Sequence, residues 1–244
     1  MYSSVLDTSF FKGVIDSADF KYVEGLFIER RYPKGSVIFL QGDEAHEMYV
    51  IKSGALKIYR QDEGREIILG HQFPGEAIGE LEAFHYDNRR LASVSTIEET
   101  ILWMIRKSDL DRLSEKYPEL LRKALYIVSE RLSQANRKIE YLSFLDVRVR
   151  VANLLLDLNS NFGADTNQGR LVRFRVSQQY LANMIGAGRE SVARILTEFQ
   201  KERLIRIVAK DIYLENMPEI MRLSGSSSEP QEERLWHSTH KYMI

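Results

Sequence analysis

The chain contains no cysteine, and only 5 of its 244 residues are proline. Without thiols it forms no disulfide, no thiolate zinc site and no cysteine-ligated iron–sulfur cluster. No apolar run approaches the ~18 residues that cross a bilayer, and the first residues lack the basic, apolar and small-residue order of a signal peptide. The net charge of −1 excludes a uniformly basic nucleic-acid coat. These absences predict a cytoplasmic protein that does not associate with membranes.

The common signatures of catalysis are also missing. The five histidines are scattered along the chain, without the His-x-His spacing that a metal-binding barrel enzyme uses. The chain has no P-loop, no Gly-x-Gly-x-x-Gly and no serine nucleophile elbow. We therefore expect neither catalytic residues nor a metal site.

The N-terminal half is rich in turn signals. Half of the 14 glycines lie between Gly35 and Gly79, and short β-prone runs alternate with them. Such spacing is typical of an antiparallel sandwich or barrel. We predict an α+β protein in which residues 1–107 form an antiparallel β-roll of jelly-roll type. The expected strands are 37–40, 48–51, 56–59, 67–69, 91–96 and 101–105, with a hairpin tip at Asp62-Glu63-Gly64.

A helical pattern follows residue 107. Apolar residues recur at alternating spacings of 4 and 3 over three heptads, at Leu121, Leu125, Val128, Leu132, Ala135, Ile139 and Leu142. A strict 3.5-residue period favours a partner helix over the alternative, an amphipathic helix packed on its own domain. The two arrangements are compatible if one face of the helix contacts the partner helix and another face packs on its own domain. We assign residues 108–143 to a dimerisation region and expect a parallel homodimer.

Residues 177–196 have the pattern of a helix-turn-helix. Ser177 can cap the first helix, Ala182 is small where two helices cross, and Gly186 suits a tight turn. A strand pair over residues 205–214 would form a wing. The alternative is an ordinary helical hairpin, but residues 145–216 also carry 11 basic against 8 acidic side chains. We predict a winged helix-turn-helix domain over residues 144–216 and a C-terminal tail over 217–244.

The second helix of this unit leaves polar side chains outside its packing stripe. Arg189 and Glu190 occupy its first turn, and Arg194 follows one turn later. Arginine suits the O6 and N7 atoms of guanine, and glutamate suits the N4 amine of cytosine. A surface ion pair between Glu190 and Arg194 is the alternative. For the DNA backbone we expect Arg170, Arg173, Ser177, Ser191 and Lys210, with Arg175, Lys201 and Arg206 as further candidates.

The order of β-roll, long helix and winged helix-turn-helix over about residues 10–216 resembles the CRP/FNR transcription regulators. The motifs that carry the resemblance are Gly75-Glu-Ala-Ile-Gly-Glu-Leu81, Phe144-Leu-Asp-Val147 and Arg189-Glu-Ser-Val-Ala-Arg194. The resemblance implies a sequence-specific DNA-binding regulator whose Arg189, Glu190 and Arg194 recognise an inverted repeat of TGTGA-type half-sites. Members of the FNR type lack the first arginine and carry four cysteines, so an iron–sulfur oxygen sensor is excluded.

The resemblance also implies an effector site in the roll. Gly79, Glu80 and Leu81 match the turn that holds the ribose in cyclic-nucleotide members, and Arg90 matches the arginine that holds the phosphate. Leu91 stands where those members have a serine, which removes one donor from the phosphate site. The alternative for Glu80 and Arg90 is a buried structural ion pair.

Two further positions depart from the cyclic-nucleotide pattern. Ala135 and Asn136 stand where the family places a Thr-Ser pair that contacts adenine, and alanine offers no hydrogen bond. These departures favour an unidentified small molecule in the roll over cyclic AMP. We expect that effector to contact the long helix and to shift the population of DNA-competent orientations.

The expected partners are double-stranded DNA, a second copy of the chain and, by analogy with the family, RNA polymerase, at a polar loop predicted for residues 159–169. Two alternatives remain open. One is a ligand-independent regulator of the same family, always competent for DNA. The other is a cyclic-nucleotide-binding-type regulatory subunit without specific DNA binding.

Overall fold

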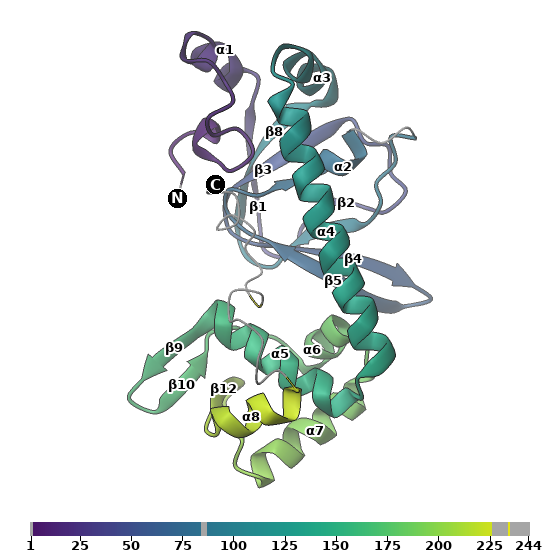
Figure 1. The fold of residues 1–244 in the computed structure, drawn as a ribbon, viewed down its shortest axis with the longest axis vertical. Coiled ribbons are helices and arrows are strands. Elements are labelled where there is room, and N and C mark those ends of the chain that lie inside the picture. Colours follow the sequence, from purple (N-terminus) through teal and green to yellow (C-terminus); the bar gives the residue numbers. More distant parts are fainter. Residues whose placement is uncertain (1, 84–86, 226–233, 235–244) are drawn as a thin grey trace. The chain divides into compact units, whose positions relative to one another are not determined.

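The computed structural model describes residues 2–83, 87–225 and 234. Contacts group these residues into two compact units. One comprises residues 2–63, 69–83 and 87–135, and the other comprises residues 64–68 and 136–225 with Arg234. Figure 1 shows both units in ribbon form.

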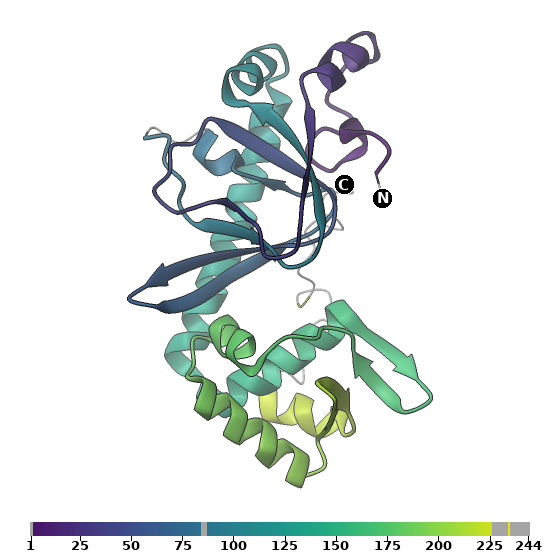
Figure 2. The same cartoon turned by 180° about the vertical axis from the view of Figure 1, so that it is seen from behind.

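Strands between residues 28 and 106 form the predicted antiparallel β-roll. Two four-stranded sheets have the orders β1-β8-β3-β6 and β2-β7-β4-β5. Figure 2 shows the roll from behind. The strands are β1 Ile28–Tyr32, β2 Val37–Phe39, β3 Glu47–Ser53, β4 Leu56–Asp62, β5 Arg65–Gln72, β6 Ala77–Ile78, β7 Ser93–Thr96 and β8 Thr100–Arg106. Strands β1 and β6 were not predicted; β6 has only two residues, and β1 is largely exposed and charged.

The packing of β8 explains its sequence. Leu102 and Met104 face a core cluster between the two sheets, whereas Trp103 and Ile105 face a second cluster made with the N-terminal segment and the following helices. A strand buried on both faces needs no polar alternation. The β4–β5 hairpin turns at Glu63 and Gly64, whose φ angles are +44° and +77°. Two left-handed residues are what a two-residue hairpin turn requires, as the sequence predicted.

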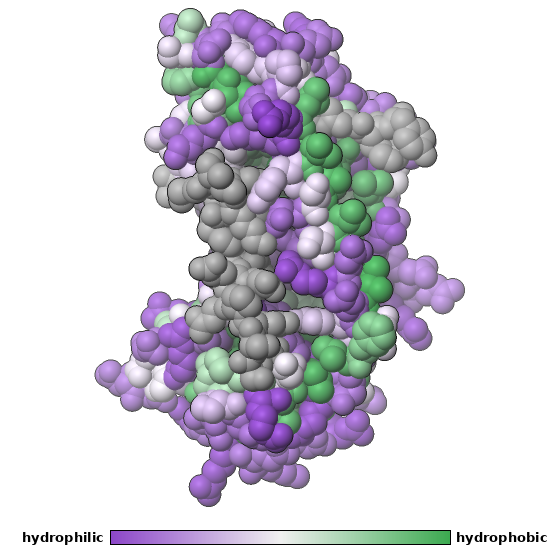
Figure 3. All heavy atoms as spheres, in the orientation of Figure 1, coloured by the Kyte–Doolittle hydropathy of each residue, from purple (hydrophilic) through white to green (hydrophobic). Residues whose placement is uncertain are grey.

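Helices flank the roll. They are the short η1 Val5–Asp7 and η2 Ser17–Asp19, then α1 Phe20–Gly25, α2 Glu80–Ala83, α3 Lys107–Lys116 and the long α4 Glu119–Phe144. Leu120, Ala124 and Ile127 bury one face of α4 in the core of the first unit. The predicted seam lies on another face, and Leu125 and Leu132 are 66% and 61% exposed. A line of hydrophobic residues accordingly follows α4 in Figure 3.

The second unit contains the helix-turn-helix and a four-stranded sheet of order β11-β12-β10-β9. The strand pair β11–β12 is the predicted wing. The elements are α5 Val147–Phe162, β9 Gly163–Thr166, β10 Gly169–Val172, α6 Gln178–Ile185, α7 Arg189–Lys201, β11 Ile205–Val208, β12 Asp211–Leu214 and α8 Met217–Ser224.

The polar loop predicted for residues 159–169 is wrong. Helix α5 continues to Phe162, and a hairpin of β9 and β10 follows. Phe162 stacks on Phe174 with ring centroids 4.6 Å apart, which anchors the helix end. The amide of Asn161 donates to the Asp157 carbonyl at 2.7 Å, so its polarity serves the helix instead of ending it.

Part of the predicted tail is also ordered. Residues 217–224 form α8, which Asn216 caps by accepting from the Glu219 N–H at 3.2 Å. Ile220 is fully buried, and Gly225, with φ +73°, ends the helix. A short helix therefore forms the first part of the segment assigned to the tail. Residues 226–233 and 235–244 of that tail lie outside the described residues.

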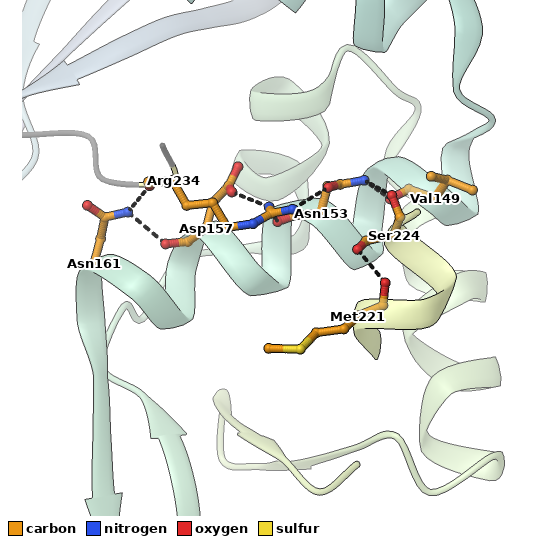
Figure 4. A network of polar contacts seen from close by, with 7 residues as sticks. All are labelled: Val149, Asn153, Asp157, Asn161, Met221, Ser224 and Arg234. Carbon is orange, nitrogen blue, oxygen red and sulfur yellow. Dashed lines mark hydrogen bonds and ion pairs between the residues drawn. The ribbon is translucent and has the colours of Figure 1, made fainter. Parts of the chain in front are cut away.

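Arg234 is held against α5. Its Nη1 donates to Asp157 Oδ1 at 2.7 Å and its Nη2 to Asn153 Oδ1 at 3.0 Å, as Figure 4 shows. Asn161 donates to the Arg234 carbonyl at 2.9 Å, and Asn153 donates to the Ser224 carbonyl at 3.1 Å. Polar side chains spaced four residues apart on α5 therefore connect this helix to α8 and to Arg234.

None of the helices among the described residues is long and apolar enough to cross a bilayer. In the same part of the chain, no three His, Cys, Asp or Glu side chains gather in a way that could hold a metal ion.

Candidate functional site

The helix-turn-helix is built as predicted. Ser177 Oγ accepts from the Tyr180 N–H at 3.1 Å and so caps α6. Gly186 ends α6 in the left-handed region at φ +60°, where a side chain would be strained. Ala182 and Val192 are fully buried where α6 and α7 pack together. This packing fixes which face of α7 remains outside.

The outer face of α7 carries the three predicted base-reading residues. Arg189, Glu190 and Arg194 are all exposed, and the first two begin the helix. The ion pair of Arg194 is with Glu198, at 4.0 Å, instead of with Glu190. With the Arg194 side chain 73% exposed, this is a weak surface pair that DNA can displace.

The predicted backbone-contacting residues differ in how they are held. Arg173 is exposed, and Lys210 lies exposed at the wing turn, where Ala209 and Lys210 both have positive φ. Ser191 is half-buried. Arg170 instead donates to Asn159 Oδ1 at 2.7 Å and pairs with Asp165 at 3.1 Å.

The further arginine candidates are also engaged. Arg175 makes a two-pronged contact with Asp211 and lowers the pKa of that carboxyl. Arg206 pairs with Glu215 at 2.9 Å and donates to the Gln168 carbonyl at 2.7 Å. These two guanidinium groups brace the wing, whereas Lys201, the remaining candidate, is exposed.

Sequence reasoning missed Arg148 on α5. Its guanidinium bridges Glu198 at 3.1 Å and Glu202 at 2.6 Å, and it lies over the Phe199 ring at 4.8 Å. It therefore positions α7 through its acidic face. The available signal was the pair of glutamates four residues apart, which share one side of the helix.

A second site lies in the roll, where Gly79 precedes α2. The Glu80 carboxylate is fully buried, and the Arg131 guanidinium of α4 lies 2.7 Å from its Oε1. Arg131 Nη2 directs a hydrogen bond to the Ala77 carbonyl at 3.1 Å, so its contact with Glu80 is an ion pair without a hydrogen bond. Burial raises the pKa of Glu80, and Arg131 opposes that rise.

Arg90 is the second buried charge of this site. Its side chain is fully buried, with Nη2 donating to the Glu47 carbonyl at 2.8 Å and the guanidinium 4.0 Å from the Phe39 ring centroid. A Cβ at Gly79, where φ is +79°, would lie 2.4 Å from Arg90 Nη1, so only glycine fits there. The structure thus brings Gly79, Glu80 and Arg90 together. The alternative of an ion pair between Glu80 and Arg90 is wrong, because Glu80 pairs with Arg131 and Arg90 with Glu47.

The other predicted effector residues are less enclosed. Leu81 is half-buried, and Leu91 is 37% exposed. Ala135 and Asn136 are exposed on α4, at the position where the contacts divide the chain into its two units. Their part in an effector site stays a prediction.

Two residues of this site were missed by sequence reasoning. Arg131 continues the buried spacing of Leu120, Ala124 and Ile127 on α4, and that spacing was a usable signal. Glu82 is only 6% exposed, although an acidic residue in a short turn suggests a solvated position. Its Oε1 accepts from the Leu91 N–H at 3.0 Å.

Comparison with known proteins matches the two domains in which these residues lie. Residues 29–117 match the cyclic nucleotide-binding domain, and residues 149–223 match the Crp-like helix-turn-helix domain. The CRP-like cAMP-activated global transcriptional regulator of Mycobacterium tuberculosis is 30% identical over 192 residues, covering 78% of this chain and 85% of the relative. The CRP-like protein Clp of Xanthomonas oryzae pv. oryzae is 33% identical over 192 residues, covering 76% and 83%.

Solved structures agree. The c-di-GMP responsive global regulator CLP of Xanthomonas campestris superposes with a TM-score of 0.74 and 30% identity, over 82% of this chain and all of that one. A CooA mutant from Carboxydothermus hydrogenoformans shares the fold, with a TM-score of 0.72 and 20% identity over 92% and 97%. The named relatives are transcription regulators, which confirms the expectation that the chain is not an enzyme. The chain belongs to the CRP family of transcription regulators, with an N-terminal cyclic nucleotide-binding-type effector domain and a C-terminal Crp-like helix-turn-helix DNA-binding domain.

Proposed function

We propose that the chain acts as a homodimer that binds an inverted repeat of TGTGA-like half-sites under the control of a small molecule in the β-roll. The exposure of Arg189, Glu190 and Arg194 on α7 carries the DNA part of this proposal. The N-terminal residues of a recognition helix enter the major groove. There Arg189 or Arg194 can donate to guanine O6 and N7, and Glu190 can accept from cytosine N4.

Phosphate contacts would position the domain on the duplex. Lys210 at the wing turn and Arg173 after β10 are exposed cations suited to this task. Ser191 and Ser177 add hydroxyl groups near the start of each helix. Arg170 would first have to leave Asp165, so we expect it to contribute least.

The exposed apolar face of α4 supports the dimer. Burial of one leucine side chain stabilises an interface by about 1.5–3 kcal/mol. In a two-fold dimer each seam residue is buried on both chains, so it contributes twice. A symmetric dimer presents two recognition helices about 34 Å apart, which matches half-sites one helical turn apart. The inverted repeat follows from the same symmetry.

The pair formed by Glu80 and Arg131 supports effector control. It connects the start of α2 directly to α4, the helix that carries the predicted seam. A molecule that binds at Glu80 therefore acts on α4 through one side-chain contact. The match to a cyclic nucleotide-binding domain supports a small-molecule effector of this kind.

A ligand-independent regulator is the second candidate. The observation in its favour is that the buried charges already have internal partners, Arg131 for Glu80 and Glu47 for Arg90. Such pairing can hold the roll closed around its charges without a ligand.

RNA polymerase remains a proposed partner by family analogy. The β9–β10 hairpin, whose Asp165 side chain is 89% exposed, is the surface that replaces the predicted loop in this proposal.

The test is a fluorescence anisotropy titration of the full chain against a labelled duplex with TGTGA and TCACA half-sites about six base pairs apart. It is run with and without cyclic AMP at fixed salt, beside a duplex of scrambled half-sites. We expect two chains per duplex and binding at least about tenfold tighter than to the scrambled duplex. Equal affinity for both duplexes would contradict the proposal.

The cyclic AMP arm separates the two candidates. Tight binding only with the nucleotide would make cyclic AMP the effector. Tight binding without it would indicate the ligand-independent regulator or a protein purified with its effector, and native mass spectrometry of the purified protein distinguishes these two.

A further inference from the structure

A buried carboxylate is held on a backbone amide beside a buried arginine. Glu82 Oε1 accepts from the Leu91 N–H at 3.0 Å, and Glu82 is 6% exposed. The preceding residue, Arg90, is fully buried, and its Nε and Nη1 have no hydrogen-bond partner within the described part of the chain. A buried guanidinium next to a backbone N–H is an arrangement that binds anions. Here the Leu91 N–H already donates to the carboxylate of Glu82.

The surroundings add further negative charge. Both carboxylate oxygens of Glu80 are buried and lack a hydrogen-bond donor among the described residues. The Glu76 carboxylate is buried too, accepts from the Phe73 N–H at 2.8 Å, and acts on Glu80 together with Glu82 to raise its pKa. Arg131 is paired with Glu80, and Arg90 is paired with Glu47 outside this group of carboxylates. In a medium of low dielectric constant, a further anion would be costly here.

We propose that Glu82 is the specificity-determining residue of the effector pocket, directing it against phosphodiesters such as cyclic nucleotides and towards small molecules without a negative charge at this position. A phosphodiester would have to displace Glu82 from the Leu91 N–H and place a second negative charge beside it. A neutral or cationic ligand avoids that repulsion, and its N–H or O–H groups can donate to the unsatisfied oxygens of Glu80. The inference rests on the proposed small-molecule control of the roll.

The test compares two ligands that differ in the phosphodiester. Cyclic AMP and adenosine are titrated calorimetrically into the full chain and three variants. Glu82→Ala removes the carboxylate and frees the Leu91 N–H, whereas Glu82→Gln removes the charge but keeps an acceptor there. Glu98→Gln is the control, because Glu98 is an exposed glutamate of the same domain.

We expect the wild-type chain to bind cyclic AMP no more tightly than adenosine. Glu82→Ala should tighten cyclic AMP binding by about tenfold or more, and Glu82→Gln by a smaller factor. The affinity for adenosine should stay unchanged in both variants, and Glu98→Gln should change the affinity for neither ligand.

Two results would overturn the proposal. One is a wild-type chain that prefers cyclic AMP to adenosine by about tenfold or more. The other is that the folded Glu82 variants bind cyclic AMP no more tightly than the wild-type chain does. Thermal unfolding checks the fold, and Glu82→Gln alone decides if Glu82→Ala does not fold. The operator titration of the same wild-type preparation tests the proposed function separately, because nucleotide selectivity is measured without DNA.

Discussion

The guanidinium of Arg131 lies 2.7 Å from the buried carboxylate of Glu80, so that α4 and the start of α2 share one ion pair. The next residue on α4, Leu132, is 61% exposed. Successive residues of a helix point about 100° apart, so Arg131 and Leu132 face different directions. One helix therefore carries both the contact to the proposed effector site and the apolar face proposed for dimerisation. A ligand that changes the first contact can bias the second without any long chain of intermediate steps.

Glu80→Gln should change how stability depends on pH. Burial raises the pKa of Glu80 above its ordinary 4.5, with Arg131 opposing and Glu82 and Glu76 adding to the rise. A carboxyl with a raised pKa holds its proton more tightly in the folded chain, so its stabilising contribution is full below about pH 4.5 and is lost as the pH rises through the folded-state value. The melting temperature of the variant relative to wild type should therefore increase with pH.

Thermal unfolding between about pH 4.5 and 8 measures this difference. The exposed Glu98→Gln variant is the control and should stay parallel to the wild type. A constant offset between Glu80→Gln and wild type at every pH would show that Glu80 does not titrate differently in the folded chain.

Leu132→Lys should give a folded single chain that does not bind the operator. The side chain is 61% exposed in the single chain, so folding tolerates lysine there, but a two-fold interface would bring two ammonium groups together. Light scattering gives the mass, and the duplex titration gives the affinity. The control is Ser133→Lys, an exposed neighbour outside the seam, which should remain a dimer. A dimeric Leu132→Lys protein would refute the proposed interface.

The features that sequence could predict are those with local causes. Ser177 caps α6 and Gly186 ends it because a helix start needs an acceptor and a tight turn needs a left-handed residue. The β4–β5 hairpin follows in the same way from Glu63 and Gly64. Each requirement is met within a few residues, so the residue types alone reveal it.

The partners of the buried charges could not be predicted, because they come from distant parts of the chain. Arg131 meets Glu80 from 51 residues away, and Arg90 meets Glu47 from 43. The polar composition of residues 159–169 also led to the wrong prediction of a loop. Asn161 lies in α5, where its side chain donates a hydrogen bond to the Asp157 carbonyl. Glu82 is a further case, since nothing in the neighbouring residues indicates that its carboxylate is buried and accepts a hydrogen bond from the Leu91 N–H.

Arg189→Ala should weaken operator binding by about 1–3 kcal/mol and relax specificity at one guanine. The reason is the loss of a bidentate contact from the first turn of α7. Duplexes that vary one base pair at a time measure the change in preference. An equal loss on every sequence would instead identify Arg189 as a phosphate contact.

Lys210→Ala provides the matched comparison on the wing. Its side chain is exposed at the turn between β11 and β12. We expect a uniform loss of affinity on all duplexes and a decrease of about one in the slope of log affinity against log salt. A loss confined to particular base pairs would assign Lys210 a role in base recognition.

Arg234→Ala should destabilise the unit that contains α5. Arg234 is 8% exposed and its guanidinium donates to both Asp157 and Asn153, so its removal takes two donors from a partly buried network. The loss of such hydrogen bonds costs about 1–3 kcal/mol of unfolding free energy. Arg234→Lys should recover only part of it, because an ammonium group cannot reproduce the two-pronged geometry. Chemical denaturation of the full chain measures these free energies.

Arg222→Ala is the control for this prediction, because Arg222 also pairs with a carboxylate in the same unit, Glu219, but is 71% exposed. An exposed pair of this kind contributes about 0.5 kcal/mol or less. If Arg234→Ala costs no more than Arg222→Ala, Arg234 contributes no more than a surface charge. If it costs several times more, the order of α5 depends on a residue beyond the matched helix-turn-helix domain, which ends at residue 223. Hydrogen exchange of the α5 amides would then rise in Arg234→Ala and stay at the wild-type rate in Arg222→Ala.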